Sequence, residues 1–141
     1  MTEPPPPFRH PFRVRYSEVD YQGVVYFAHY ATYCDVAIHE FYRSLPYDYT
    51  EVRKTSGTDF HVVRSLIEYR RPLRFDEAFE VEIRLGRIGR SSLTFRPALY
   101  ALGEAEPRAI ADIVSVHADQ ASMRAVPLPE RLLALLAPYR P

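Results

Sequence analysis

The chain has a single cysteine, Cys34, so no disulfide can form within it. It has no net charge, because 18 basic side chains balance 18 acidic ones, and a general nucleic-acid binder would have a basic excess. Its apolar stretches are far shorter than the roughly 20 residues that span a bilayer, so we expect no membrane span. The first residues also lack the basic and apolar regions of a secretory signal. Together these absences predict a cytoplasmic protein that does not bind nucleic acid.

The length of 141 residues and the apolar content of 47% are typical of one globular domain. Four consecutive prolines, Pro4 to Pro7, favour polyproline II and cannot join a helix or a sheet ladder. We therefore expect residues 1–9 to be a disordered, proline-rich tail and residues 10–141 to form a single domain.

One long helix is predicted at about residues 28–45. Its apolar residues recur at steps of three and four and form a single stripe, and Pro46 marks its end. Cys34 lies on this stripe, which predicts a buried, inert thiol rather than a nucleophile. Asp35 and His39 lie off the stripe, four residues apart, and are expected to pair on the helix surface.

Much of the remaining chain alternates apolar and polar residues, a pattern typical of strands. We predict strands at residues 12–17, 59–70, 79–85, 93–99 and 108–118, a loop at 46–57, turns at 86–90 and 103–107, and a short terminal helix at 128–136. Pro97 lies inside one of these strands, which suggests a sheet edge or a bulge. One strand, one helix and then four strands in a meander indicate an α+β domain with an antiparallel sheet. The helix covers one sheet face, so a second copy of the chain is expected to cover the remaining apolar surface.

The most informative residue is Asp20, which precedes the predicted helix in a loop that also contains Gly23. Glycine permits a tight or left-handed turn, and the first N–H groups of a helix have no partner within it. Such N–H groups suit a developing oxyanion, and a nearby carboxylate can attack a carbonyl carbon or deprotonate a water. Acyl transfer needs these two parts. A simpler interpretation makes Asp20 the cap of a turn or of the helix.

The segment from residue 13 to residue 30 resembles the signature of the 4-hydroxybenzoyl-CoA thioesterase family of hotdog proteins. In that signature, a basic and an aliphatic residue precede Asp-x-x-Gly-aliphatic-Val-x-aromatic-x-x-Tyr. The matching residues are Arg13, Val14, Asp20, Gly23, Val24, Val25, Phe27 and Tyr30. The likeness extends over roughly residues 12–128. It departs from the family at Val19, where Thr or Cys is common, and at Phe27, where one branch has His. The departure at Phe27 favours the aromatic-acyl branch or a relative of it.

The resemblance implies a hotdog fold, in which an antiparallel sheet of about five strands wraps around one long helix. It also implies a homodimer or homotetramer that hydrolyses an acyl-CoA to free acid and CoA without a metal or cofactor. In this reading Asp20 is the nucleophile or general base, and the backbone N–H of Phe27 polarises the thioester carbonyl. Arg90 and Arg124 would hold the CoA phosphates, with two solvated surface arginines as the alternative.

Gly23, Tyr26, His29 and Tyr30 are the expected substrate-binding residues of the same segment. His29 has an alternative interpretation as a partly exposed helix histidine. Two other functions fit the same pocket. One is hydrolysis of an acyl chain from acyl carrier protein, although enzymes of that kind often lack an acid at the position of Asp20. The other is binding of acyl-CoA without catalysis.

Overall fold

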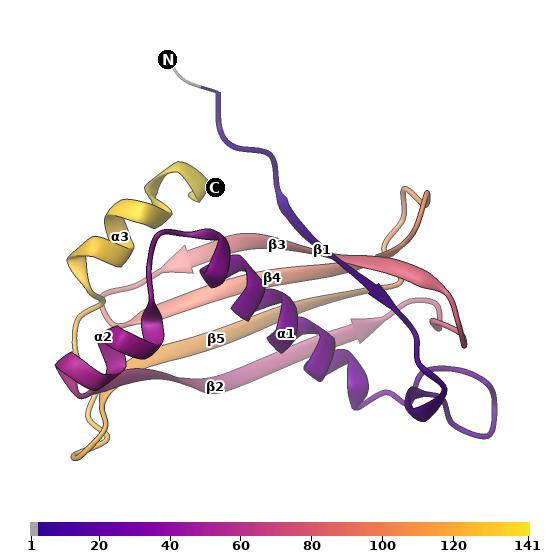
Figure 1. The fold of residues 1–141 in the computed structure, drawn as a ribbon, viewed down its shortest axis with the longest axis horizontal. Coiled ribbons are helices and arrows are strands. Elements are labelled where there is room, and N and C mark those ends of the chain that lie inside the picture. The colour runs from indigo at the N-terminus through magenta and orange to yellow at the C-terminus, as the bar shows by residue number, and fades with distance from the viewer. Residues whose placement is uncertain (1–2) are drawn as a thin grey trace.

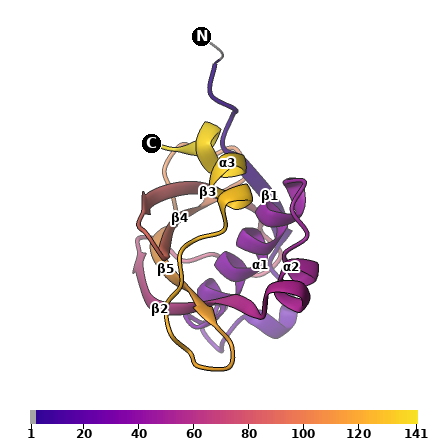
Figure 2. The same cartoon turned by 90° about the vertical axis from the view of Figure 1, so that its left-hand side faces the viewer.

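Five antiparallel strands form one sheet that curves around helix α1 in the computed structural model, which describes residues 3–141 (Figures 1 and 2). In sheet order the strands are β1 (Phe8–Arg13), β3 (Ala78–Ile88), β4 (Ser92–Ala101), β5 (Ala109–Asp119) and β2 (Thr58–Tyr69). The helices are α1 (His29–Ser44), α2 (Tyr49–Ser56) and α3 (Glu130–Leu136), with short 3-10 turns at Tyr16–Glu18 and Ala137–Tyr139. The predicted α+β class, five-stranded sheet and long helix are confirmed.

Helix α1 lies on the concave face of the sheet because its apolar stripe faces the strands. Tyr33, Ala37 and Phe41 on this stripe are at most 3% exposed. The ring of Phe41 meets those of Phe8 on β1 and Phe95 on β4, with centroids 5.7 and 5.9 Å apart. Burial of such large side chains contributes roughly 1.5–3 kcal/mol each, so this contact holds the helix against the sheet.

The strand connections differ from the expected meander. Only β3, β4 and β5 follow one another across the sheet, whereas β2 pairs with β5 and β1 pairs with β3. Alternation reveals strands but not their partners, which is why this expectation was wrong. Pro97 lies in the central strand β4 rather than at an edge. The β4–β5 ladder is interrupted between Phe95 and Ala98 without a change of register, and this gap accommodates the missing proline N–H.

Some boundaries also differ from the prediction. Strand β1 begins at Phe8 and ends at Arg13, so residues 8–9 belong to the sheet rather than to the expected tail. Residues 1–2 of that tail lie outside the described residues. Strand β3 continues to Ile88, so the turn expected at residues 86–90 begins later.

The segment 46–57, expected to be a loop, contains helix α2. The Asp48 carboxylate accepts hydrogen bonds from the N–H groups of Thr50 and Glu51, each 3.2 Å long. Gly57 ends the helix in the left-handed region, at φ +69°. An aspartate followed three residues later by a glutamate is a helix-start pattern, and it was the signal available in the sequence.

Strand β2 forms one edge of the sheet, and this edge is apolar. Within residues 3–141 it pairs only with β5, so its other side leaves ladder N–H and C=O groups without strand partners. Val62 and Val63 are each 60% exposed, and Leu66 and Tyr69 are 43% and 49% exposed. The strand therefore combines apolar surface with unused pairing groups.

Candidate active site

The loop between β1 and α1 folds back on itself as a small hairpin. The Tyr26 N–H donates to the Glu18 carbonyl and the Asp20 N–H donates to the Val24 carbonyl, both at 2.9 Å. Gly23 closes the turn at φ +78°, which favours glycine at this position. Asp20 thus lies at the turn of the hairpin. The loop between β1 and α1 is at the end of the molecule where α1 begins (Figure 1).

Asp20 is half-buried, and its carboxylate makes one hydrogen bond within residues 3–141. Its Oδ1 accepts the N–H of Gln22 at 2.8 Å, which is the turn cap of the simpler interpretation. No salt bridge to Asp20 is found among residues 3–141, and its Oδ2 accepts no hydrogen bond there. The cap therefore orients the carboxylate and leaves one oxygen available.

The start of α1 offers an unused donor. The His29 N–H donates to the Tyr26 carbonyl at 2.9 Å, and the Tyr30 N–H donates to the Phe27 carbonyl at 3.2 Å. Within residues 3–141 the Phe27 N–H has no acceptor. It lies just before the first turn of a 16-residue helix, where the helix dipole is positive. A carbonyl oxygen placed there would meet a donor that is otherwise unpaired.

Two tyrosines fix this loop against the chain that follows β2. The Tyr30 hydroxyl accepts the Leu73 N–H at 3.0 Å, while the Leu73 carbonyl accepts the Val25 N–H at 2.8 Å. Burial raises the pKa of Tyr30, so its hydroxyl stays protonated and can still donate. The Tyr69 hydroxyl donates to the Phe27 carbonyl at 3.3 Å. The expected site residue Tyr30 therefore has a structural contact as well.

Tyr26 and His29 lie on the open side of the loop. Their rings are 5.9 Å apart, and Tyr26 is 46% exposed. The Phe27 ring projects beside them, with its centroid 4.9 Å from that of Tyr26. The hairpin and the residues that follow it thus hold Gly23, Tyr26 and His29 in the same short segment as Asp20.

A buried carboxylate in this loop, Glu18, was not anticipated. It accepts the N–H of Arg15 at 2.8 Å and its guanidinium at 3.1 Å, and it is 6% exposed. Burial alone would raise the pKa of Glu18, but the hydrogen bonds from Arg15 outweigh it, so the pKa is lowered. Its carbonyl also accepts Tyr26, which makes Glu18 an anchor of the hairpin. Nothing in the sequence pattern distinguishes it from a surface glutamate.

Arg90 and Arg124 lie at the end of the sheet opposite the Asp20 loop. The Arg90 carbonyl accepts the Leu128 N–H, and the Arg124 carbonyl accepts the N–H of Asp119, the last residue of β5. The first residues of β5 lie instead near the Asp20 loop. The Arg108 carbonyl, just before β5, accepts the Arg70 N–H at 2.9 Å, and the neighbouring Tyr69 contacts Phe27. At about 3.3 Å per residue, β5 separates the two ends by roughly 30 Å. One chain therefore does not bring these arginines to Asp20.

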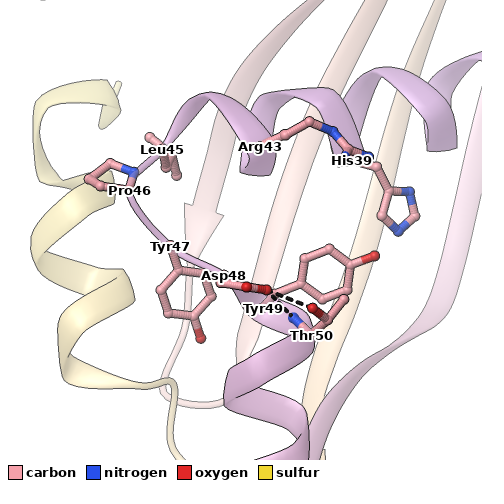
Figure 3. Close-up of a pocket in the computed structure, with 8 residues that line it drawn as sticks. All are labelled: His39, Arg43, Leu45, Pro46, Tyr47, Asp48, Tyr49 and Thr50. Carbon is pink, nitrogen blue, oxygen red and sulfur yellow. Dashed lines mark hydrogen bonds between the residues drawn. The ribbon is translucent and has the colours of Figure 1, made fainter.

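One cavity is lined by residues remote from Asp20. It measures about 590 Å³ and lies between the C-terminal half of α1 and the start of α2, where His39 and Arg43 face Tyr47, Asp48 and Tyr49 (Figure 3).

His39 Nδ1 lies 3.5 Å from the Asp35 carboxylate, so the expected surface pair is confirmed.

Cys34 is 1% exposed, and burial raises the pKa of its thiol to about 12, as expected of an inert cysteine. Among residues 3–141, no group of three or more His, Cys, Asp and Glu side chains is placed to hold a metal ion. No helix in that range is long and apolar enough to cross a membrane.

Comparison with known proteins identifies the family. The model of the thioesterase-like superfamily matches residues 14–136, and the chain belongs to this family. A putative esterase of Aquifex aeolicus is 30% identical over 130 residues, which cover 92% of this chain and 98% of that protein. The acyl-CoA thioester hydrolase YbgC of Escherichia coli is 28% identical over 132 residues, or 90% and 93% of the two chains.

The fold has close counterparts among solved structures. The crystal structure of a hypothetical protein from Aquifex aeolicus superposes with a TM-score of 0.83 at 28% identity, over 92% of this chain and 99% of that one. The expected hotdog fold is therefore confirmed, and the chain is a thioester hydrolase.

Proposed function

We propose that this protein hydrolyses an acyl-CoA to the free acid and CoA, with Asp20 as the catalytic carboxylate. The observation that carries the proposal is that two groups occur in one short segment. One is the Asp20 carboxylate, whose Oδ2 accepts no hydrogen bond within residues 3–141, and the other is the Phe27 N–H, which has no acceptor there. The N–H polarises the thioester carbonyl and stabilises the oxyanion. Asp20 then either attacks the carbonyl carbon, so that CoA leaves and water cleaves the resulting anhydride, or takes a proton from the attacking water. Neither route uses a metal or a cofactor.

The matches to the 4-hydroxybenzoyl-CoA thioesterase signature at Asp20, Gly23 and Phe27 support this assignment. A relative named as an acyl-CoA thioester hydrolase aligns over most of both chains, which favours CoA over acyl carrier protein as the leaving group. The carrier-protein thioesterase and the non-catalytic acyl-CoA binder are the alternatives.

The CoA phosphates are proposed to be held by Arg90 and Arg124 of a second copy. The exposed edge of β2 suits antiparallel pairing with its own counterpart about a two-fold axis. In such a pair, the last residues of one β2 lie beside the first residues of the other β2. The last residue, Tyr69, contacts Phe27 of its own chain. That start pairs with Asp119, whose N–H donates to the Arg124 carbonyl. This proposed two-fold axis would bring the arginines of one chain toward the Asp20 loop of the other.

The test is Asp20→Asn, which keeps the size of the side chain and its ability to accept the Gln22 N–H. We expect kcat for an acyl-CoA to fall by at least about a hundredfold, the typical lower contribution of a general base, with Kd nearly unchanged. Asp112→Asn, on the outer sheet face beside Arg96, is the matched control and should retain full activity. Retention of more than half of the activity in Asp20→Asn would return Asp20 to the role of a turn cap.

Two other results would select the alternatives. Binding of acyl-CoA without turnover by the wild type would favour the binding module. Turnover of acyl carrier protein thioesters at least tenfold faster than of the CoA thioesters would favour the carrier-protein enzyme.

A further inference from the structure

A second cavity, the flank groove, runs along the side of α1 that faces β2. It measures about 340 Å³. Helix α1 packs against β1, β3 and β4. On the β2 side of the helix Val62 and Ser65 are exposed, whereas Ile113 of β5 is buried. The groove is lined by Cys34 and Ile38 on α1, Val62 and Ser65 on β2, and Phe95 and Ile113 on its floor. Its volume lies within the range of about 300–1,000 Å³ typical of small-molecule sites.

The near end of the groove lies beside the proposed oxyanion donor. Ala31 lines this end and follows Phe27 by one helical turn. Tyr69 of β2 contacts the Phe27 carbonyl through its hydroxyl, so the helix start and the strand meet there. A thioester whose carbonyl faces the Phe27 N–H therefore has its acyl group directed into the groove.

The far end of the flank groove meets a more polar cavity, although Asp35 and Ser115 also line the groove itself. His39 lines both the flank groove and the larger cavity of Figure 3, and its ring lies 5.6 Å from that of Tyr49. Beyond it, Arg43, Asp48 and Thr50 supply charged and hydroxyl groups. Methylenes placed there would remove water from these groups, so an apolar chain gains by stopping at His39.

We infer that the acyl group is a linear chain of about 12 to 14 carbons, with His39 and Ser65 setting its length; this rests on the proposed thioester hydrolysis. From Phe27 to His39 the helix rises about 18 Å, at about 1.5 Å per residue. An extended carbon chain advances roughly 1.25 Å per atom, from bonds of about 1.52 Å and angles near 111°. Such a chain fills the groove, whereas a cavity of about 150 Å³ suffices for a benzene ring. An aromatic acyl group would leave more than half of the groove empty.

The test is a chain-length series of acyl-CoA thioesters from four to sixteen carbons, together with benzoyl-CoA. Each buried methylene contributes about a fourfold factor, so kcat/KM should rise at least about a hundredfold from the shortest chains to an optimum at about 12 to 14 carbons. Ser65→Trp fills the groove and should shift the optimum to shorter chains, while His39→Ala opens the far end and should shift it to longer ones. Arg64→Trp places the same ring on the opposite face of β2 and is the matched control.

The outcomes separate this inference from the proposed function. Asp20→Asn, titrated calorimetrically with alkyl-CoA thioethers that cannot be hydrolysed, reports occupation of the groove without turnover. If this binding tightens with chain length but the wild type has no thioesterase activity, the groove is supported and the proposed hydrolysis is overturned. A flat length profile, or a preference for benzoyl-CoA, in an active enzyme would overturn the groove alone. Dissociation of the oligomer by Ser65→Trp, with equal loss for every chain length, would assign the groove to a second copy and overturn the inference.

Discussion

A mixture of two inactive variants should regain activity if each active site takes residues from two chains. Asp20→Asn removes the proposed catalytic carboxylate, and the double variant Arg90→Ala/Arg124→Ala removes the proposed phosphate ligands. The two sets of residues lie roughly 30 Å apart in one chain, at opposite ends of β5. In a mixed dimer, the chain with intact Asp20 faces the chain with intact arginines, so one complete site forms.

The size of the recovery follows from counting sites. Random reassortment of equal amounts makes about half of the dimers mixed, each with one complete site of two, so activity should reach about a quarter of that of the wild type. Each lost charge-assisted phosphate contact is of order 1.5–3 kcal/mol, so the double arginine variant alone should lose more than about a hundredfold in kcat/KM. The assay is release of free thiol at substrate concentrations well below KM, after the mixed variants are unfolded and refolded together.

Three controls make the result decisive. Sedimentation should show that each variant alone assembles like the wild type, and each refolded alone should stay inactive. A short thioester without the nucleotide should be cleaved normally by the arginine variant. Refolded mixtures that assemble but stay inactive would mean that the arginines act within their own chain or not at all, and the two-chain site would be refuted.

Two further predictions concern buried groups. The pKa of Glu18 is lowered below its ordinary value of 4.5, so this carboxylate stabilises the fold above that pH and loses its contribution as the pH falls below it. The melting temperature of the wild type should therefore exceed that of Glu18→Gln near neutral pH, and the difference should shrink as the pH falls below 4.5. A constant difference would contradict this role. Cys34 should not react with a disulfide reagent in the native protein and should react fully in denaturant, because burial raises its pKa to about 12. Rapid labelling of the folded protein would show that α1 opens.

The long helix and the strands of the sheet could be predicted because both depend on local periodicity. The stripe that contains Tyr33 and Phe41 and the alternation from Phe79 to Leu85 are visible in the sequence and are buried as expected. The pairing of β2 with β5 could not be predicted, because a strand's partner is chosen by packing across the whole chain rather than by its own residues. The same limit applies to the ladder gap at Pro97.

The candidate site was predicted only as a segment of sequence. The placement of Asp20 before Gly23 and the helix start could be anticipated from turn and helix-end chemistry. The burial of Glu18 could not, because its environment is made by Arg15 and by α1 packing above the hairpin. The distance between Asp20 and Arg90 was equally hidden, since sequence spacing does not tell at which end of a sheet a turn lies.

The edge of β2 also affects how the protein must be made. A chain that has folded but has not yet met its partner presents a strand of 12 residues without proline, in which Asp59, Arg64 and Glu68 are the only charges. Such an edge templates pairing with any extended segment, and aggregation then competes with correct assembly. A lysine at Val63 would act as a gatekeeper against aggregation, but it would also interrupt the apolar edge through which two copies are proposed to pair. Expression yield is therefore expected to depend on how quickly new chains encounter one another.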